Sequence, residues 1–356
     1  MKKKIRVLII DDSALIRKLL TEILESDPDI KVIDTATDPY VARDKIKRLK
    51  PDVLTLDIEM PKMDGITFLR NLMRLHPMPV VMVSTLTNKG ADVTLESLAL
   101  GAVDYVSKPK SDVSHSLQDY TEEIIEKVKV AANANIHALV HTSPVKVDPK
   151  LSADAVLDKT TTRSYRTTDK VIAIGASTGG TEAIKNVLVN LPADSPGIVI
   201  SQHIPESFSA SFAERMDRLS ILNVHEARDG QAIMSGNVYI APGNKHLIVK
   251  RDGARYVCHL NDGSPVNRHK PSVDVMFRSV AQSAGPNAIG IILTGMGDDG
   301  ARGMQEMHEA GAITIAQDQN TSVVWGMPGE AVKLGCIDNI LPLQNIAGKI
   351  ITLSKE

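Results

Sequence analysis

Short apolar runs alternate with amphipathic stretches along the first third of the chain. The runs Ile5–Ile10, 53–56 and 80–83 predict buried strands, and shorter apolar pairs at 32–33 and 105–106 complete a set of five. Between them, apolar residues recur at the three- and four-residue spacing of a buried helical face. Strands that alternate with helices in this way predict an α/β domain, built on a five-stranded parallel sheet with helices on both faces.

This regular alternation ends near residue 132 and returns near residue 169. The segment 133–168 contains Ser-Pro and Asp-Pro pairs and repeated Thr and Lys, which predict an interdomain linker. Residues 169–356 then show apolar strands again, including Gly197–Gln202, with helical spacing between them. The chain is therefore expected to hold two α/β domains, at residues 1–132 and 169–356.

The second domain also contains an irregular central part. Three short strands, Asn237–Ile240, 246–249 and 256–260, lie around Pro-Gly and Asp-Gly turns, and their spacing predicts antiparallel pairing. The strands on either side are separated by helices, which favours parallel pairing. We therefore expect a doubly wound, mostly parallel α/β domain with an antiparallel hairpin insertion.

Composition excludes several classes of protein. Among 356 residues there are 41 Lys and Arg and 43 Asp and Glu, a net charge of −2 that argues against a nucleic-acid or membrane-surface binder. Two cysteines are too few for a disulfide framework. No apolar run approaches the roughly 18 residues of a membrane span, so no membrane insertion is expected. We expect a cytoplasmic protein.

Polar residues gather at the predicted strand ends of the first domain. Asp11 and Asp12 follow the first strand, Asp57 the third, Ser84 the fourth and Lys108 the fifth. Each alone has an ordinary explanation, a helix cap or a surface charge. Together they predict a site, because the carboxyl ends of parallel strands meet at one edge of the sheet. Three carboxylates there require a cation, and oxygen-only ligands suit Mg²⁺.

The second domain begins with a strand, a glycine-rich turn and a helix. The turn Gly175-Ala-Ser177-Thr-Gly179 matches the G-x-S-x-G pattern of serine hydrolases in the context that the pattern requires. With Gly180 it also lies one residue from a dinucleotide-binding fingerprint, and a helix N-terminus is a ready anion site. The turn alone therefore leaves two hypotheses, a nucleophilic Ser177 or a phosphate-binding loop.

A serine nucleophile needs a base and an orienting acid. His203 ends the next strand, and Asp299 ends a later one in the loop TGMGDDG, so parallel strands would bring both to the edge that carries Ser177. Asp298 competes with Asp299 for the role of the acid. His308 would match the chain order of α/β-hydrolases, but it lies in a helix only nine residues after Asp299, and we disfavour it.

Residues 1 to about 130 resemble a response-regulator receiver domain, whose fold is a flavodoxin-like sheet. The resemblance is carried by the acidic pair, by the segment LDIEMPKMDG and by the SKP segment. It implies phosphorylation with the help of Mg²⁺ and assigns roles to six residues. These are Asp11 and Asp12 as metal ligands with Asp57, Asp57 as phospho-acceptor, and Ser84, Tyr105 and Lys108 as switch residues.

Residues 170–354 resemble the catalytic domain of the CheB family of chemotaxis protein-glutamate methylesterases. Matching stretches include GASTGGTEA, ISQHIPESFSASFAERM, RHKPSVDVMFRS and LTGMGDDGARG. The resemblance implies Ser177 as nucleophile, His203 as base and Asp299 as orienting acid. It also implies an oxyanion position at the backbone N–H of Met296, with Thr178 beside it.

The resemblance further implies a function and its partners. The enzyme would hydrolyse glutamate γ-methyl esters on the cytoplasmic domains of chemoreceptors, release methanol, and deamidate specific receptor glutamines. A chemotaxis histidine kinase would supply the phosphoryl group for Asp57, and we expect the unphosphorylated receiver to cover the Ser177 cleft. The esterase itself would need no cofactor. The alternative is a receiver-controlled output module that binds nucleotide or protein without hydrolysis.

Overall fold

The protein is described by a computed structural model that covers residues 3–84, 88–108, 116–136, 138 and 170–355. The chain divides into two compact units, residues 1–141 and 142–356. Most of the predicted linker, 133–168, lies outside the described residues, so the domain boundaries stay a prediction. Within the described ranges, no helix is both long and apolar enough to cross a membrane.

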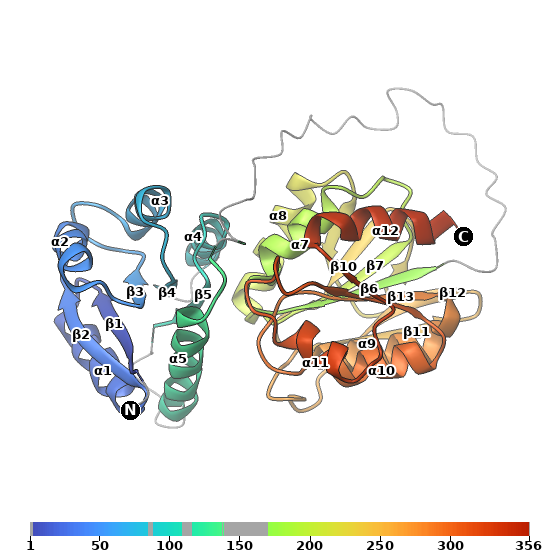
Figure 1. Ribbon diagram of the computed structural model, residues 1–356. Coiled ribbons are helices and arrows are strands. Elements are labelled where there is room, and N and C mark those ends of the chain that lie inside the picture. Colours follow the sequence, from blue (N-terminus) through green and yellow to red (C-terminus); the bar gives the residue numbers. More distant parts are fainter. Residues whose placement is uncertain (1–2, 85–87, 109–115, 137, 139–169, 356) are drawn as a thin grey trace. The chain divides into compact units, whose positions relative to one another are not determined.

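Unit 1 is a five-stranded parallel sheet with the strand order β2-β1-β3-β4-β5. Helices α1 and α5 cover one face, and α2, α3 and α4 cover the other (Figure 1). The sequence predicted five parallel strands with helices on both faces, and the ends of several elements differ from the prediction. Its elements are β1 (Ile5–Ile10), α1 (Ala14–Glu25), β2 (Ile30–Ala36), α2 (Pro39–Leu49), β3 (Val53–Asp57), α3 (Gly65–Leu75), β4 (Val80–Ser84), α4 (Asn88–Ala99), β5 (Asp104–Ser107) and α5 (Ser116–Ala132).

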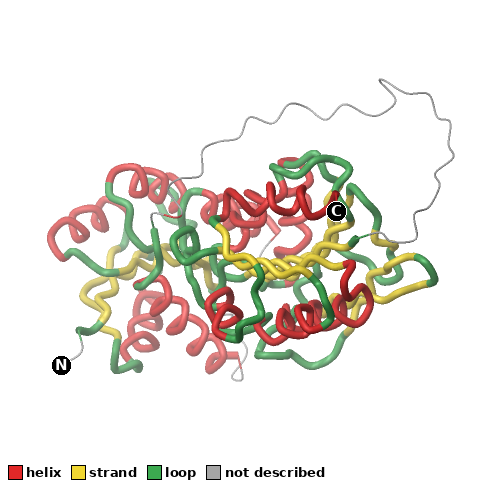
Figure 2. Tube along the Cα trace, turned by 45° about the vertical axis from the view of Figure 1, so that its right-hand side comes forward, coloured by secondary structure: helices red, strands yellow, loops and turns green. Residues whose placement is uncertain are grey.

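Unit 2 is built on a seven-stranded sheet in the order β15-β14-β13-β6-β7-β10-β8, parallel throughout. Its strands form a layer between two sets of helices (Figures 1 and 2). The strands are β6 (Val171–Ala176), β7 (Gly197–Gln202), β8 (Asn223–Glu226), β10 (Asn237–Ile240), β13 (Ala288–Ile292), β14 (Ile313–Gln317) and β15 (Asn339–Leu341).

The helices of unit 2 divide between the faces of this sheet, α7, α8 and α12 on one and α9, α10 and α11 on the other (Figure 1). A small antiparallel sheet, β11-β12-β9, accompanies it. These elements are α7 (Gly180–Leu188), α8 (Glu206–Leu219), β9 (Ala232–Ile233), β11 (His246–Asp252), β12 (Arg255–Asn261), α9 (Val273–Ala284), the 3₁₀ turn η2 (Gly285–Asn287), α10 (Ala301–Glu309), α11 (Met327–Lys333) and α12 (Leu343–Lys355).

One predicted pairing is wrong. Strands β11 and β12 form the expected antiparallel hairpin, but Asn237–Ile240 joins the main sheet as β10 and pairs in parallel with β7 and β8. The residues Val238, Tyr239 and Ile240 are all buried, as a strand between two neighbours requires. Short spacing between strands favours a hairpin only when both strands belong to one sheet, and here residues 241–245 lead from the main sheet to the small one.

The order of the strands determines where a ligand can bind. Strand β6 lies between β13 and β7, and the chain winds away from it in opposite directions on the two sides. In open parallel sheets, ligands bind at the carboxyl ends of strands at such a switch point. Helix α9 packs closely under β6, where a side chain on Gly175 would come within 2.2 Å of Val273 Cγ1. The loops that follow β6, β7 and β13 are therefore the first place to look for a site.

Candidate active site

Ser177 lies in a tight turn directly after β6. Its N–H donates to the carbonyl of Thr294 (3.0 Å), and the N–H of Gly180 donates back to the Ser177 carbonyl (2.6 Å). Gly179, at φ 76°, caps α7 in a left-handed conformation that favours glycine. These bonds fix the turn so that a half-buried serine stands at the carboxyl edge of the sheet.

His203 follows β7 and contacts Ser177 across the strand ends. Its N–H continues the parallel ladder by donating to the Ala176 carbonyl (3.2 Å). Ring atom Nδ1 lies 3.1 Å from Ser177 Oγ, and Nε2 lies 2.8 Å from Asp299 Oδ2. The structure therefore brings together the three residues that the sequence analysis singled out in unit 2.

Asp299 is a buried carboxylate with five hydrogen-bond donors, and only 1% of it is exposed. It lies at the N-terminus of α9, whose backbone N–H groups and dipole favour an anion. Burial by itself raises the pKa of Asp299, but the hydrogen bond and charge of His203, with bonds from Asn267 and the Val273 N–H, hold it well below its usual range. The donors are His203 Nε2, Asn267 Nδ2, Ser272 Oγ and the N–H groups of Val273 and Asp274.

Asp298, the competing candidate, is differently placed. Its side chain is exposed, and its carbonyl accepts from the Ala301 N–H at the start of α10. The geometry thus separates the two aspartates: Asp299 faces the histidine from a buried position, and Asp298 lies exposed in the loop before α10. His308 is also remote from this cluster, because it lies on α10 and pairs with Asp338.

The network fixes the protons on His203. An ionised Asp299 only accepts hydrogen bonds, so Nε2 must carry the proton that it shares with Oδ2. In the neutral ring, Nδ1 then has a lone pair, which faces the Ser177 hydroxyl. The nitrogens have the opposite assignment in the best-known serine proteases, but the roles depend on geometry and not on which nitrogen is used. The arrangement is able to withdraw a proton from Ser177.

The predicted oxyanion residues lie on both sides of Ser177. Gly295 runs so close that a side chain there would come within 2.9 Å of Ser177 Cβ, and Met296 is the next residue. Among the described residues, the Met296 N–H has no hydrogen-bond partner, so it is available as a donor. Thr178 is buried, and its carbonyl accepts from Thr294 Oγ1 (3.0 Å).

Three residues around the site were not predicted from the sequence. Asn267 and Ser272 donate to Asp299, and the ring of His269 stacks on that of His203 with centroids 3.6 Å apart. All three belong to the segment before α9, whose sequence has no pattern that predicts a helix or a strand. The resemblance of RHKPSVDVMFRS to a family motif covers His269 and Ser272 but not Asn267, and it assigns no contact to individual side chains.

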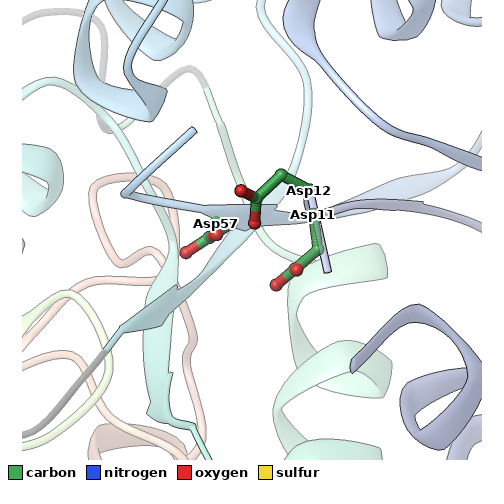
Figure 3. A group of neighbouring side chains, drawn as sticks. All are labelled: Asp11, Asp12 and Asp57. Carbon is green, nitrogen blue, oxygen red and sulfur yellow. The ribbon is translucent and has the colours of Figure 1, made fainter. Parts of the chain in front are cut away.

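Unit 1 has a second cluster of functional groups at the carboxyl ends of its strands. Ligand oxygens of Asp11, Asp12 and Asp57 all lie within 4.8 Å of one another (Figure 3). Lys108 Nζ lies 2.8 Å from Asp57 Oδ2 and 3.1 Å from Asp11 Oδ2. Burial raises the pKa of Asp57 to about 6, and the charge of Asp11 adds to the effect while Lys108 opposes it. The single lysine does not balance the three carboxylates, and their oxygens suit a hard divalent cation.

The two other predicted switch residues are buried near this edge. Ser84 ends β4, and its hydroxyl accepts from Thr94 Oγ1 of α4 (3.1 Å). Tyr105 is only 7% exposed, and Lys127 Nζ both donates to its carbonyl (2.6 Å) and lies 4.9 Å from its ring centroid. The sequence-predicted residues of unit 1 thus lie on, or directly after, the adjoining strands β1, β3, β4 and β5.

Comparison with known proteins assigns the chain to a family. The family model for CheB methylesterase matches residues 172–350, and that for response regulator receiver domains matches residues 7–118. The protein-glutamate methylesterase/protein-glutamine glutaminase of Hydrogenovibrio crunogenus is 58% identical over 99% of this chain and 100% of its own. The chain belongs to the CheB methylesterase family.

Other similar proteins agree with this assignment. Protein-glutamate methylesterase/protein-glutamine glutaminase 1 of Xanthomonas campestris pv. campestris is 57% identical over 99% of this chain and 98% of its own. The crystal structure of the Thermotoga maritima CheB methylesterase catalytic domain superposes with a TM-score of 0.51 and 38% identity, over 52% of this chain and 98% of that one. The α/β fold class and the family expected from sequence are confirmed, and the roles of single site residues stay predictions.

The two neighbouring aspartates provide a direct test of the site. We expect Asp299→Asn to lower kcat for ester hydrolysis by about 10⁴-fold, because an amide lacks the charge that stabilises a protonated His203. Asp298→Asn should change it less than about threefold, since its exposed side chain does not contact the ring. Methanol release by matched amounts of folded protein measures both, and a larger loss at Asp298 would contradict the assignment.

Proposed function

We propose that this CheB-family enzyme hydrolyses glutamate γ-methyl esters on the cytoplasmic domains of chemoreceptors and deamidates specific receptor glutamines. Ser177 is the nucleophile, His203 the base and Asp299 the orienting acid. One observation carries the proposal: Ser177 Oγ lies 3.1 Å from His203 Nδ1, and Nε2 of the same ring lies 2.8 Å from the buried Asp299. The names of the similar proteins support this pair of reactions.

Acyl transfer follows from this geometry in two steps. As Oγ attacks the ester carbonyl, its proton passes to Nδ1, and the charge of Asp299 stabilises the imidazolium. The imidazolium returns the proton to the departing methoxide, so methanol leaves and a glutamyl-serine ester remains. Water then attacks this ester with the same base, which frees the glutamate. A glutamine side chain enters the same sequence and loses ammonia in place of methanol.

Negative charge on the carbonyl oxygen needs hydrogen-bond donors while the intermediate lasts. We assign this role to the N–H of Met296, which follows the residue packed against Ser177, with Thr178 beside the nucleophile. Losing one oxyanion donor in other serine hydrolases costs about 10²–10³ in kcat. A backbone donor also keeps its place when side chains change, so the hole is set by the loop after β13.

The receiver unit is proposed to regulate this reaction. Asp11, Asp12 and Asp57 would hold Mg²⁺, which supplies charge neutralisation for phosphoryl transfer when bound. A chemotaxis histidine kinase provides the phosphoryl group, and Asp57 accepts it. Lys108 is already within 2.8 Å of Asp57, and Ser84 and Tyr105 on the adjoining strands respond to the new charge.

The proposal that Ser177 is the nucleophile is tested by replacing this residue. Ser177→Ala should lower methanol release from methylated receptor membranes by several orders of magnitude while the fold is retained, because only oxyanion and binding effects remain. A fluorophosphonate probe should label the wild-type protein at Ser177 and leave the variant unlabelled. Tight nucleotide binding without turnover would instead support the phosphate-binding alternative, and near-normal methanol release by the variant would exclude the serine mechanism.

Phosphorylation is tested at Asp57. Acetyl phosphate or the phosphorylated kinase should label the protein only with Mg²⁺ or a similar divalent ion, because a phosphoryl group cannot approach three carboxylates without a cation. Asp57→Asn should lose the label. Asp64 is an exposed aspartate at the start of α3, so Asp64→Asn serves as a control and should keep the label. An undiminished label on Asp57→Asn would point to another acceptor.

Regulation is tested by separating the units. Phosphorylation should raise the activity of the intact protein, whereas a fragment beginning near residue 168 should be insensitive to phosphodonor and more active than the intact unphosphorylated protein. Each tenfold of activation corresponds to about 1.4 kcal/mol of coupling energy, which repacking around one phosphoryl group readily supplies. Equal turnover of a small soluble methyl ester by fragment and intact protein would rule out inhibition by the receiver.

A further inference from the structure

A tight turn over the active site has an unusual composition. The N–H groups of Val266 and His269 each donate to the other's carbonyl (3.0 and 2.9 Å), which closes a four-residue turn. Its two central residues, Asn267 and Arg268, have φ values of 51° and 68°, the left-handed pair that defines a type I′ turn. Glycine, asparagine and aspartate dominate such positions, so Asn267 is an ordinary residue here and Arg268 is the unusual one. Asparagine differs from glycine at its position by having a side chain that can make contacts.

The Asn267 side chain reaches two buried carboxylates. Its Nδ2 donates to Asp299 Oδ1 (2.8 Å) and to Asp274 Oδ2 (2.7 Å), while the other oxygen of Asp274 accepts from the Gly303 N–H (2.7 Å). Both partners are acceptors, and the two N–H bonds of the amide NH₂ group satisfy them together. Burial raises the pKa of Asp274, and the charge of Asp299 adds to that shift. One amide thus separates two anionic groups that would otherwise repel across the same space.

His269, the last residue of the turn, contacts the proposed base His203. The His269 ring stacks on that of His203, with centroids 3.6 Å apart and planes 13° from parallel. The hydrogen bonds at Nδ1 and Nε2 restrict rotation of the His203 ring within its plane, but they do not prevent the ring from tilting about the line that joins them. The His269 ring, stacked on one face, opposes this tilt. The turn therefore holds the acid through Asn267 and the base through His269.

We propose that Asn267 and His269 are positioning residues for the esterase reaction. Asn267 keeps the Asp299 carboxylate turned so that Oδ2 faces Nε2, and His269 keeps the His203 ring in the plane that joins Oδ2 to Ser177 Oγ. The inference rests on the proposed function and deepens it. Neither residue touches the reacting atoms, so both act on kcat through the alignment of the triad and leave substrate binding unchanged.

The turn supplies its own matched control. Asn267→Gly and Arg268→Gly each replace one left-handed residue with glycine, which favours that conformation, so the turn survives both changes. Only the first removes a contact to the triad, since the Arg268 side chain is exposed and makes no hydrogen bond or ion pair with the described residues. In the full-length protein, phosphorylated with acetyl phosphate, Asn267→Gly should lower kcat on methylated receptor membranes about ten- to a hundredfold with KM unchanged. Arg268→Gly should keep the wild-type kcat.

The stacked histidine is tested by a conservative and a disruptive change. His269→Phe keeps a flat ring against His203 and should retain kcat within about threefold, whereas His269→Ala should lose about tenfold or more. The same order should appear in the rate at which a fluorophosphonate labels Ser177, which does not depend on the receptor. The far-downfield proton of the Nε2–H···Oδ2 bond in NMR spectra should weaken in Asn267→Gly and persist in Arg268→Gly.

The outcomes separate the inference from the function on which it rests. If Asn267→Gly matches Arg268→Gly in kcat, labelling rate and proton signal, the positioning role of Asn267 is wrong although the serine mechanism stands. If wild-type Ser177 is not labelled at all, both fail. Should Asn267→Gly not fold, the isosteric Asn267→Asp replaces it: a third carboxylate facing Asp274 and Asp299 should reduce kcat further, and an unimpaired Asn267→Asp overturns the proposal.

Discussion

The proposed active site depends on one buried charge, the carboxylate of Asp299. A group that is 1% exposed is ionised only if its environment replaces the water it has lost, and five donors do so here. Two of them are backbone N–H groups at the start of α9, which no substitution of a side chain removes directly. Because the charge persists, the proton on His203 stays at Nε2 and the lone pair at Nδ1 stays aimed at Ser177. The chemistry of the serine thus follows from the solvation of the aspartate.

The parallel sheet makes this solvation possible with residues that are far apart in sequence. Strands β6, β7 and β13 are neighbours, so the residues that follow them meet although more than a hundred positions separate Ser177 from Asp299. Helix α9 must approach β6 closely to present its N-terminus, and Gly175 provides the space that Val273 then fills. The site is therefore positioned by backbone elements, which is the condition for a fixed alignment of catalytic groups.

Much of this was predictable from the sequence, and the remainder was not for physical reasons. Apolar runs and strand-end polar residues identified the sheets, and with them Ser177, His203 and the pair Asp298 and Asp299, because periodicity and parallel topology are properties of the chain. Only the family resemblance favoured Asp299 over Asp298. The parallel pairing of β10 was missed, since spacing between strands does not say in which sheet a strand lies. Asn267 and His269 were missed because a type I′ turn without glycine has no strong signal. The choice of Nδ1 for Ser177 depends on side-chain packing, which no pattern encodes.

The two sites of the chain use carboxylates at the edge of a parallel sheet in opposite electrostatic states. Five hydrogen-bond donors surround the Asp299 carboxylate and stabilise its charge, so the pKa of Asp299 falls below the usual range. Around Asp57, burial and the charge of Asp11 raise the pKa to about 6, and one lysine leaves the cluster under-compensated. The first site is complete and has no electrostatic reason to change its arrangement. The second has more negative than positive charge, and a bound cation would offset the excess. In the proposed regulation by phosphorylation, the carboxylates that respond to a bound ligand therefore belong to unit 1, and the carboxylate that keeps its charge belongs to unit 2.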